Sequence, residues 1–158
     1  MANVPIIEQA KIQARVLVPL IKALREEMGT ERAHALVRKA LGDMYRKLGR
    51  ESWQRQGARS AEDKLERSWQ AFGAADALKY DVLKKTPDAY EVNVTECQYA
   101  KFYKELGEPE LGFLLACSPD FPLVEGYGEV KLQRTQTIMQ GASHCDFRYR
   151  LEQKKPER

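Results

Sequence analysis

The chain has 158 residues, of which 43% are hydrophobic and 31% charged. This size and composition are typical of one globular domain that buries a hydrophobic core, and we expect a single domain over residues 1–158. The formal net charge is only +3, and the 26 basic and 23 acidic side chains are interspersed. Because surfaces that bind nucleic acid usually cluster basic residues, we expect no nucleic-acid partner.

The sequence predicts neither a membrane partner nor secretion. No apolar run reaches the ~18 residues that a membrane span needs, and the first residues lack the pattern of a signal peptide. The three cysteines are an odd number without regular spacing, which argues against a disulfide framework. Since unpaired thiols persist in reducing compartments, we expect a cytoplasmic location.

Residues 1–75 predict a mainly helical layer. Apolar side chains recur at steps of three and four over 7–28 and again over 33–48, which indicates two amphipathic helices. Pro19 lies inside the first helix and predicts a kink or a break there. Ser60 starts a capping box for a third helix. Heptad spacing in the N-terminal helix also favours a homo-oligomer formed through it, as an alternative to packing within the domain.

Residues 76–152 predict an antiparallel sheet of about four strands. Side chains alternate between apolar and polar over 78–82 and 90–94, on either side of a Pro-Asp turn, which predicts a β-hairpin. The segments 129–139 and 144–152 alternate in the same way and predict the second hairpin.

A helical insertion is predicted between the two hairpins. The segments 98–107 and 108–117 indicate helices, whereas 118–128 contains two prolines and two glycines and predicts a loop. Residues 153–158 form a basic tail. Helices followed by two hairpins define an α+β fold, in which the N-terminal helices pack on one face of the sheet.

The last predicted strand begins with the triplet His-Cys-Asp. Neighbouring side chains of a strand point to opposite faces, so Cys145 shares the apolar face with Phe147. His144 and Asp146 share the other face. Cys145 is therefore either a small core residue or a residue that faces a pocket under the sheet, and His144 is a candidate general base near neutral pH.

A second candidate group opens the first inserted helix. Thr95 and Gln98 form a capping box, which places Cys97 in the first helical turn, where the helix dipole lowers the pKa of a thiol. The alternative is a buried cysteine that fills a gap. Glu96 either continues the apolar face of its strand, where burial would raise its pKa, or lies exposed.

Cys117 and Asp120 follow the second inserted helix. Cys117 lies at a helix C-terminus, which disfavours a thiolate, and Asp120 is either a substrate-holding carboxylate or a turn residue. A divalent metal held by Cys97, Cys117 and Cys145 is an alternative use of the thiols. The sequence has no glycine-rich phosphate loop and no dinucleotide fingerprint, and no cofactor is predicted.

Two segments carry a resemblance to a known family. The stretches VTECQYAKFYKELGEPELGFLLACSPDF and RTQTIMQGASHCDFRYR resemble the aminothiazoline-carboxylate hydrolase family of bacteria. The glycine turn that runs into CDFR is also similar, more distantly, to small-ligand-binding domains of the vinyl-reductase type. The first resemblance implies a hydrolase that opens a cyclic amidine or isothiourea ring, and the second implies a non-catalytic domain that binds a small ligand or a metal.

The first resemblance gives the candidate residues a chemical rationale, because an amidinium carbon is open to attack by a thiolate. Cys97 is then the expected nucleophile, and Glu96 and Asp120 orient the small-molecule substrate. His144 or Asp146 relays protons. Cys117 and Cys145 line the pocket, and either is an alternative nucleophile.

Overall fold

The computed structural model describes residues 3–152, so the predicted basic tail lies outside the described residues. The chain begins with α1 (Ile6–Met28), α2 (Thr30–Arg55), α3 (Ala61–Phe72) and a 3-10 turn (Ala74–Asp76). The Ser60 hydroxyl accepts a hydrogen bond from the Asp63 N–H, which confirms the predicted cap of the third helix. The predicted break at Pro19 is wrong, because α1 is one continuous helix. Pro19 is exposed, and the buried Ala14 and Ile21 anchor the helix on either side of it.

The sheet has four antiparallel strands, as predicted. They are β1 (Leu78–Lys85), β2 (Ala89–Cys97), β3 (Val130–Gln133) and β4 (Cys145–Leu151), in the order β1-β2-β4-β3. The predicted strand 129–139 is too long, because β3 ends at Gln133 and a 3-10 turn follows (Ile138–Gln140). Beyond β3, the N–H groups of Thr135 and Gln136 donate to the carboxylate of Asp146, so these groups do not take part in a ladder.

The insertion between the hairpins is more helical than predicted. It contains α4 (Gln98–Glu105), α5 (Pro109–Gly112), a π-helical turn (Phe113–Cys117) and α6 (Asp120–Tyr127). The predicted loop over 118–128 is therefore wrong. Pro119 and Pro122 lie at the start of α6, where a missing N–H costs no intrahelical hydrogen bond. Gly126 lets α6 approach α2 closely, since a Cβ there would lie 2.2 Å from the Arg46 carbonyl oxygen.

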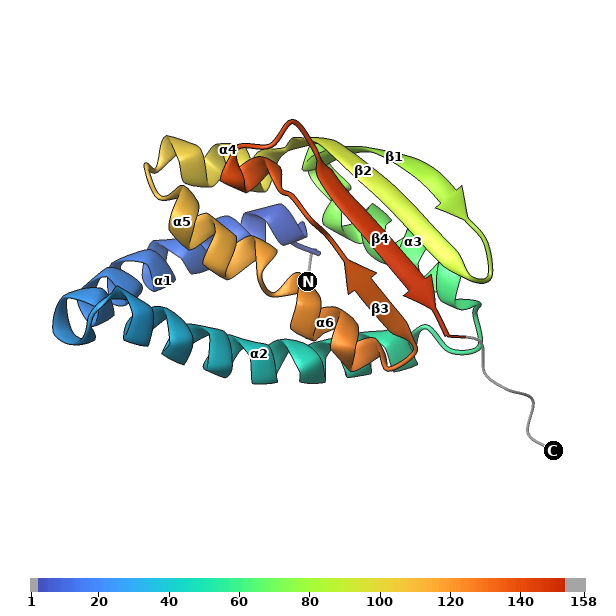
Figure 1. Cartoon of the computed structure of the whole chain (residues 1–158), viewed down its shortest axis with the longest axis horizontal. Coiled ribbons are helices and arrows are strands. Elements are labelled where there is room, and N and C mark those ends of the chain that lie inside the picture. The colour runs from blue at the N-terminus through green and yellow to red at the C-terminus, as the bar shows by residue number, and fades with distance from the viewer. Residues whose placement is uncertain (1–2, 153–158) are drawn as a thin grey trace.

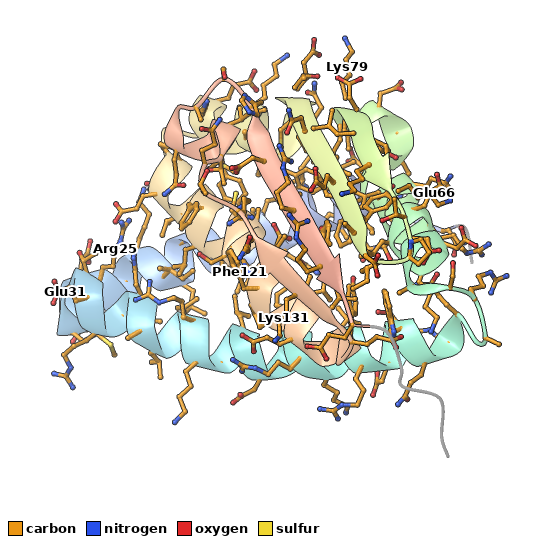
Figure 2. All side chains as sticks on the ribbon, turned by 45° about the vertical axis from the view of Figure 1, so that its right-hand side comes forward. Arg25, Glu31, Glu66, Lys79, Phe121 and Lys131 are labelled. Atoms are coloured by element: carbon orange, nitrogen blue, oxygen red, sulfur yellow. The ribbon has the colours of Figure 1, made fainter. Side chains whose placement is uncertain are left out.

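The two faces of the sheet have opposite character. The inner face buries Tyr90, Val92 and Phe147 against α3 and α6, which lie on one side of the sheet (Figure 1). On the outer face, Arg150 donates to Glu91 at 3.0 Å. Exposed lysines on both edge strands, including Lys79 and Lys131 (Figure 2), oppose pairing with another sheet. The described helices α3 and α6 pack against the inner face, in agreement with the predicted α+β arrangement.

The buried residues form two clusters that meet beside β2 and β4. One cluster lies between the sheet, α3 and α6, and the other joins α1 to α4 and α5. Cys97 and Ile138 pack against both clusters. The candidate site lies at this junction.

The outward surface of α1 exposes several apolar side chains, among them Ile12, Val16 and Leu20. The homo-oligomer through the N-terminal helix remains a prediction. Over residues 3–152, no helix combines the length and the hydropathy that crossing a membrane demands.

Candidate active site

A cavity of about 520 Å³ lies between the helical layer and the inner face of the sheet. Five of the six α-helices (all but α5), the π-helical turn and three of the four strands contribute to its wall, mostly with apolar and aromatic side chains. Gln9 and Gln13 of α1 and Met44 and Leu48 of α2 line the cavity and are also exposed. We call these four residues the mouth, because they mark where the cavity meets solvent.

Four of the predicted site residues line this cavity, namely Cys97, Cys117, Asp120 and Cys145. They come from the start of α4, the π-helical turn, the start of α6 and the start of β4. Residues up to 48 positions apart in the sequence (97 to 145) thus share one enclosed space. The apolar-face position predicted for Cys145 explains its place, since that face of β4 forms a wall of the cavity.

The other three predicted residues lie outside the cavity. Glu96 is exposed and pairs with Lys79, with 3.0 Å between Oε1 and Nζ. Asp146 accepts hydrogen bonds from the backbone and hydroxyl of Thr135 and from the Gln136 N–H. Burial pushes the Asp146 pKa upward, but these hydrogen bonds outweigh it and the pKa is lowered. Asp146 therefore stabilises the loop after β3.

His144 has local partners on the same outer side of β4. Its Nδ1 lies 2.9 Å from the Ser143 hydroxyl, and Gln136 Nε2 lies 3.3 Å from each ring nitrogen. The strand alternation that places Cys145 in the cavity turns His144 and Asp146 away from it. The structure thus gives no support to a proton relay through either residue, or to Glu96 as a substrate-orienting group.

An ion pair that the sequence did not reveal is the main polar feature of the cavity. Arg134 Nη1 donates to Asp120 Oδ2 at 2.7 Å and to the Cys117 carbonyl oxygen at 3.2 Å. The Arg134 side chain is only 3% exposed, and its guanidinium lies 5.0 Å from the ring centre of Phe121 and 5.3 Å from that of Phe147. Phe121 is labelled in Figure 2. The pair links α6 to the segment after β3.

The strand pattern did contain a signal for Arg134. Val130, Leu132 and Arg134 alternate along one face, and the first of them is buried in the core. An arginine that continues the apolar face of a strand needs a buried partner. Asp120 supplies the charge of that partner.

Asp120 has an unusual protonation equilibrium. Burial raises its pKa from 3.8 to about 6, although Arg134 opposes the shift by its charge and its hydrogen bond. The side chain still keeps 27% of its surface accessible and lines the cavity. A carboxylate with a pKa near 6 is ionised at neutral pH and can accept a proton from a reacting group.

The thiols behave differently from the prediction. Cys97 caps α4 itself, since its Sγ accepts from the Ala100 N–H at 3.4 Å, whereas Thr95 lies in β2. Burial nevertheless raises the Cys97 pKa to about 11, against the expected lowering at a helix start. Burial likewise raises the pKa of Cys117 and Cys145. Desolvation outweighs the helix terminus, so all three groups are thiols at neutral pH.

The arrangement gives no support to the alternative metal site. Across the described part of the chain, no three His, Cys, Asp or Glu side chains are grouped closely enough to hold a metal ion. The Cys97 and Cys145 sulfurs instead accept hydrogen bonds from the backbone N–H groups of Ala100 and Ile138.

Comparisons with known proteins address the family. No curated protein shows significant sequence similarity to the chain. Among solved structures, the fold is similar to a trafficking protein particle complex subunit 3 from Naegleria fowleri covalently bound to palmitic acid, with a TM-score of 0.49 and 15% identity over 93% of this chain and 99% of that chain. The family model of L-2-amino-thiazoline-4-carboxylic acid hydrolase matches residues 9–149, which include every residue of the ion pair and all three thiols. The chain therefore belongs to the L-2-amino-thiazoline-4-carboxylic acid hydrolase family.

Proposed function

We propose that the protein is a hydrolase that opens a small cyclic amidine or isothiourea ring, and that the cavity is its active site. The observation that carries the proposal is the buried pair of Asp120 and Arg134 on the wall of an otherwise apolar cavity. Membership of the hydrolase family supports the reaction class. An enclosed site with few polar groups is typical of small-molecule binding, and it strengthens each electrostatic contact within it.

The pair is complementary to the compound that gives the family its name. An aminothiazoline carboxylate carries an amidine-like group and a carboxylate. Asp120 can accept hydrogen bonds from the amidine nitrogens, and Arg134 can donate to the carboxylate, each as a charge-assisted hydrogen bond. All the side-chain hydrogen bonds that Arg134 makes within residues 3–152 come from Nη1, so its other two nitrogens have no hydrogen-bond partner among these residues.

Asp120 has the properties of a general base for the reaction. Its ionised carboxylate would take a proton from a water molecule as the water oxygen bonds to the amidine carbon. The tetrahedral intermediate would then release the ring nitrogen or sulfur as the carbon–heteroatom bond breaks. The protonated Asp120 would return the proton to the leaving atom. Water is consumed, and the carboxylate is regenerated.

The covalent route with Cys97 as nucleophile is the alternative mechanism. In that route Asp120 would deprotonate a thiol, and the thiolate would attack the amidine carbon. The raised thiol pKa values weigh against a preformed thiolate. Cys117 and Cys145 remain alternative nucleophiles of this route.

The test is turnover of 2-aminothiazoline-4-carboxylate and related cyclic amidines, measured as a mass gain of one water. Asp120→Asn should reduce the rate at least ~100-fold. The matched control Glu96→Gln should keep wild-type activity, because Glu96 is an exposed carboxylate outside the cavity. Full activity of Asp120→Asn would refute the base assignment.

Three further variants separate the two mechanisms. If Asp120 activates water directly, Cys97→Ala, Cys117→Ala and Cys145→Ala should each remain active within ~10-fold. Complete loss in one of them, with the fold retained in circular dichroism, would favour the covalent route. Tight binding of a cyclic amidine without any product would instead support a non-catalytic ligand-binding domain.

A further inference from the structure

We propose that the ligand of this site carries an apolar substituent, an alkyl or aryl group of several carbon atoms, beside the polar group that meets Asp120 and Arg134. This inference rests on the proposed function and names its substrate class more narrowly. It follows from the size of the cavity, the origin of its wall residues and the apolar rim of the mouth.

The cavity is too large for the small polar ring alone. Aminothiazoline carboxylate has about nine non-hydrogen atoms, and at the ~30 Å³ that one water molecule occupies in the liquid they would fill at most ~270 Å³. This is about half of the 520 Å³ available. Well-packed cores contain few voids larger than a water molecule, so the remaining space is not an ordinary packing defect.

The wall is divided between charged and apolar segments of the chain. Both charged groups come from the start of α6 and from the segment after β3. The lining side chains of α1, α2 and α3 are mainly apolar, and they include Leu17, Leu41, Leu48 and Phe72. A ligand held by the ion pair therefore has apolar surroundings on its other sides, where water would find few partners.

The mouth of the cavity is also partly apolar. Met44 and Leu48 keep 48% and 42% of their surface exposed where the cavity opens. Gln9 and Gln13 of α1, the other two residues of the mouth, carry no charge. An apolar group passes an uncharged entrance with an apolar rim more readily than a charged group does, because the charged group would lose its hydration there.

A graded series of compounds tests the inference. The probes are 2-aminothiazoline-4-carboxylate and its 5-alkyl derivatives from methyl to hexyl, and the dissociation constant and kcat/KM are measured for each. Burial of each added methylene should tighten binding about fourfold until the cavity is filled. A flat series, or exclusion of the longer compounds while the parent is hydrolysed, would overturn the inference and leave the proposed function intact.

Matched variants locate the subsite. Ala10→Phe adds a ring to the α1 wall of the cavity and should weaken binding of the hexyl compound at least ~10-fold, with little effect on the parent. Ala23→Phe places the same ring at an exposed position of α1 outside the wall and should change neither. If Ala10→Phe does not fold, Met44→Trp at the exposed rim serves the same purpose. If Ala10→Phe, Met44→Trp and the wild type all bind the hexyl compound equally well, the inference is overturned.

The outcomes also separate this inference from the proposed function. If affinity rises along the series but no compound is hydrolysed, the apolar subsite stands and the hydrolase proposal fails. If the rate of hydrolysis and the affinity both rise along the alkyl series, the apolar subsite and the hydrolase proposal are both supported.

Discussion

Replacing Asp120 with asparagine should change how the stability of the protein depends on pH. The Asp120 pKa is raised by burial from 3.8 to about 6 in the folded protein. A carboxyl group with a higher pKa in the folded state holds its proton more tightly there. Its stabilising contribution is therefore complete below about pH 4 and is lost as the pH rises through about 6.

The size of the effect follows from the shift. A change of about two pKa units corresponds to about 3 kcal/mol in the free energy of unfolding. Asparagine is neutral at every pH. In this respect it resembles the protonated carboxyl group, which also provides no counter-charge for Arg134. The variant and the wild type should therefore be similarly stable near pH 4. At pH 7.5, the variant should be more stable by about 3 kcal/mol.

Urea unfolding followed by tryptophan fluorescence at several pH values measures this difference. Trp53 and Trp69 are both buried in the core and report on its exposure. Glu96→Gln is the control, since this exposed carboxylate should leave the pH profile unchanged. If the profiles of Asp120→Asn and the wild type run parallel, the carboxyl group does not carry a raised pKa.

Two other predictions concern packing, and chemical denaturation measures both. Gly49→Ala should lower the free energy of unfolding by about 3 kcal/mol, because the new Cβ would lie 2.1 Å from the Leu123 carbonyl oxygen. The control is Gly42→Ala on the same helix, whose new Cβ meets only the Arg46 side chain. This variant should be as stable as the wild type or more stable. Equal stability of the two variants would contradict this reading of the contact between α2 and α6. Tyr90→Phe should not reduce stability, because the Tyr90 hydroxyl is buried without a hydrogen-bond partner among residues 3–152. A loss above ~1 kcal/mol would show an unrecognised partner.

Periodicity was a reliable guide to the fold where one face of an element is buried. The alternation of Tyr90, Val92 and Val94 predicted β2, and all three are buried on the inner face. It failed where tertiary contacts decide the conformation. α6 has too short an apolar stripe and too many prolines to predict a helix, yet Gly126 and its neighbours pack closely against α2. The shortening of β3 depends on Asp146, whose hydrogen bonds form only in the folded chain.

The candidate site was predictable in part, because strand alternation shows on which face of the sheet a side chain lies. Strand alternation placed Cys145 under the sheet and His144 and Asp146 outside it, although all three entered the predicted site. No local pattern reveals that Arg134 reaches Asp120, 14 positions away, because a buried ion pair is a property of the assembled layers. The pKa of Cys97 shows the same limit. Its helix-start position is local, but the burial that dominates its pKa comes from two core clusters.

The three thiols offer an independent test of the role of Asp120. Burial is the first cause of the raised pKa of Cys97, Cys117 and Cys145, and the charge of Asp120 adds to it in each case. Asp120→Asn removes that charge, so the thiol pKa values should fall and alkylation by iodoacetamide at pH 7.5 should accelerate several-fold. Glu96→Gln is again the control, since it lies outside the cavity.

Alkylation and turnover should then move in opposite directions in the same variant. If Asp120 is the general base, Asp120→Asn gains thiol reactivity while it loses hydrolysis by a factor of ~100 or more. A thiolate nucleophile that needs no base would instead gain in both assays, because its own deprotonation limits the rate. If alkylation and hydrolysis both become faster in Asp120→Asn, Asp120 has no role in the mechanism. If alkylation becomes faster and hydrolysis slower, the Asp120 carboxylate is the group that transfers the proton.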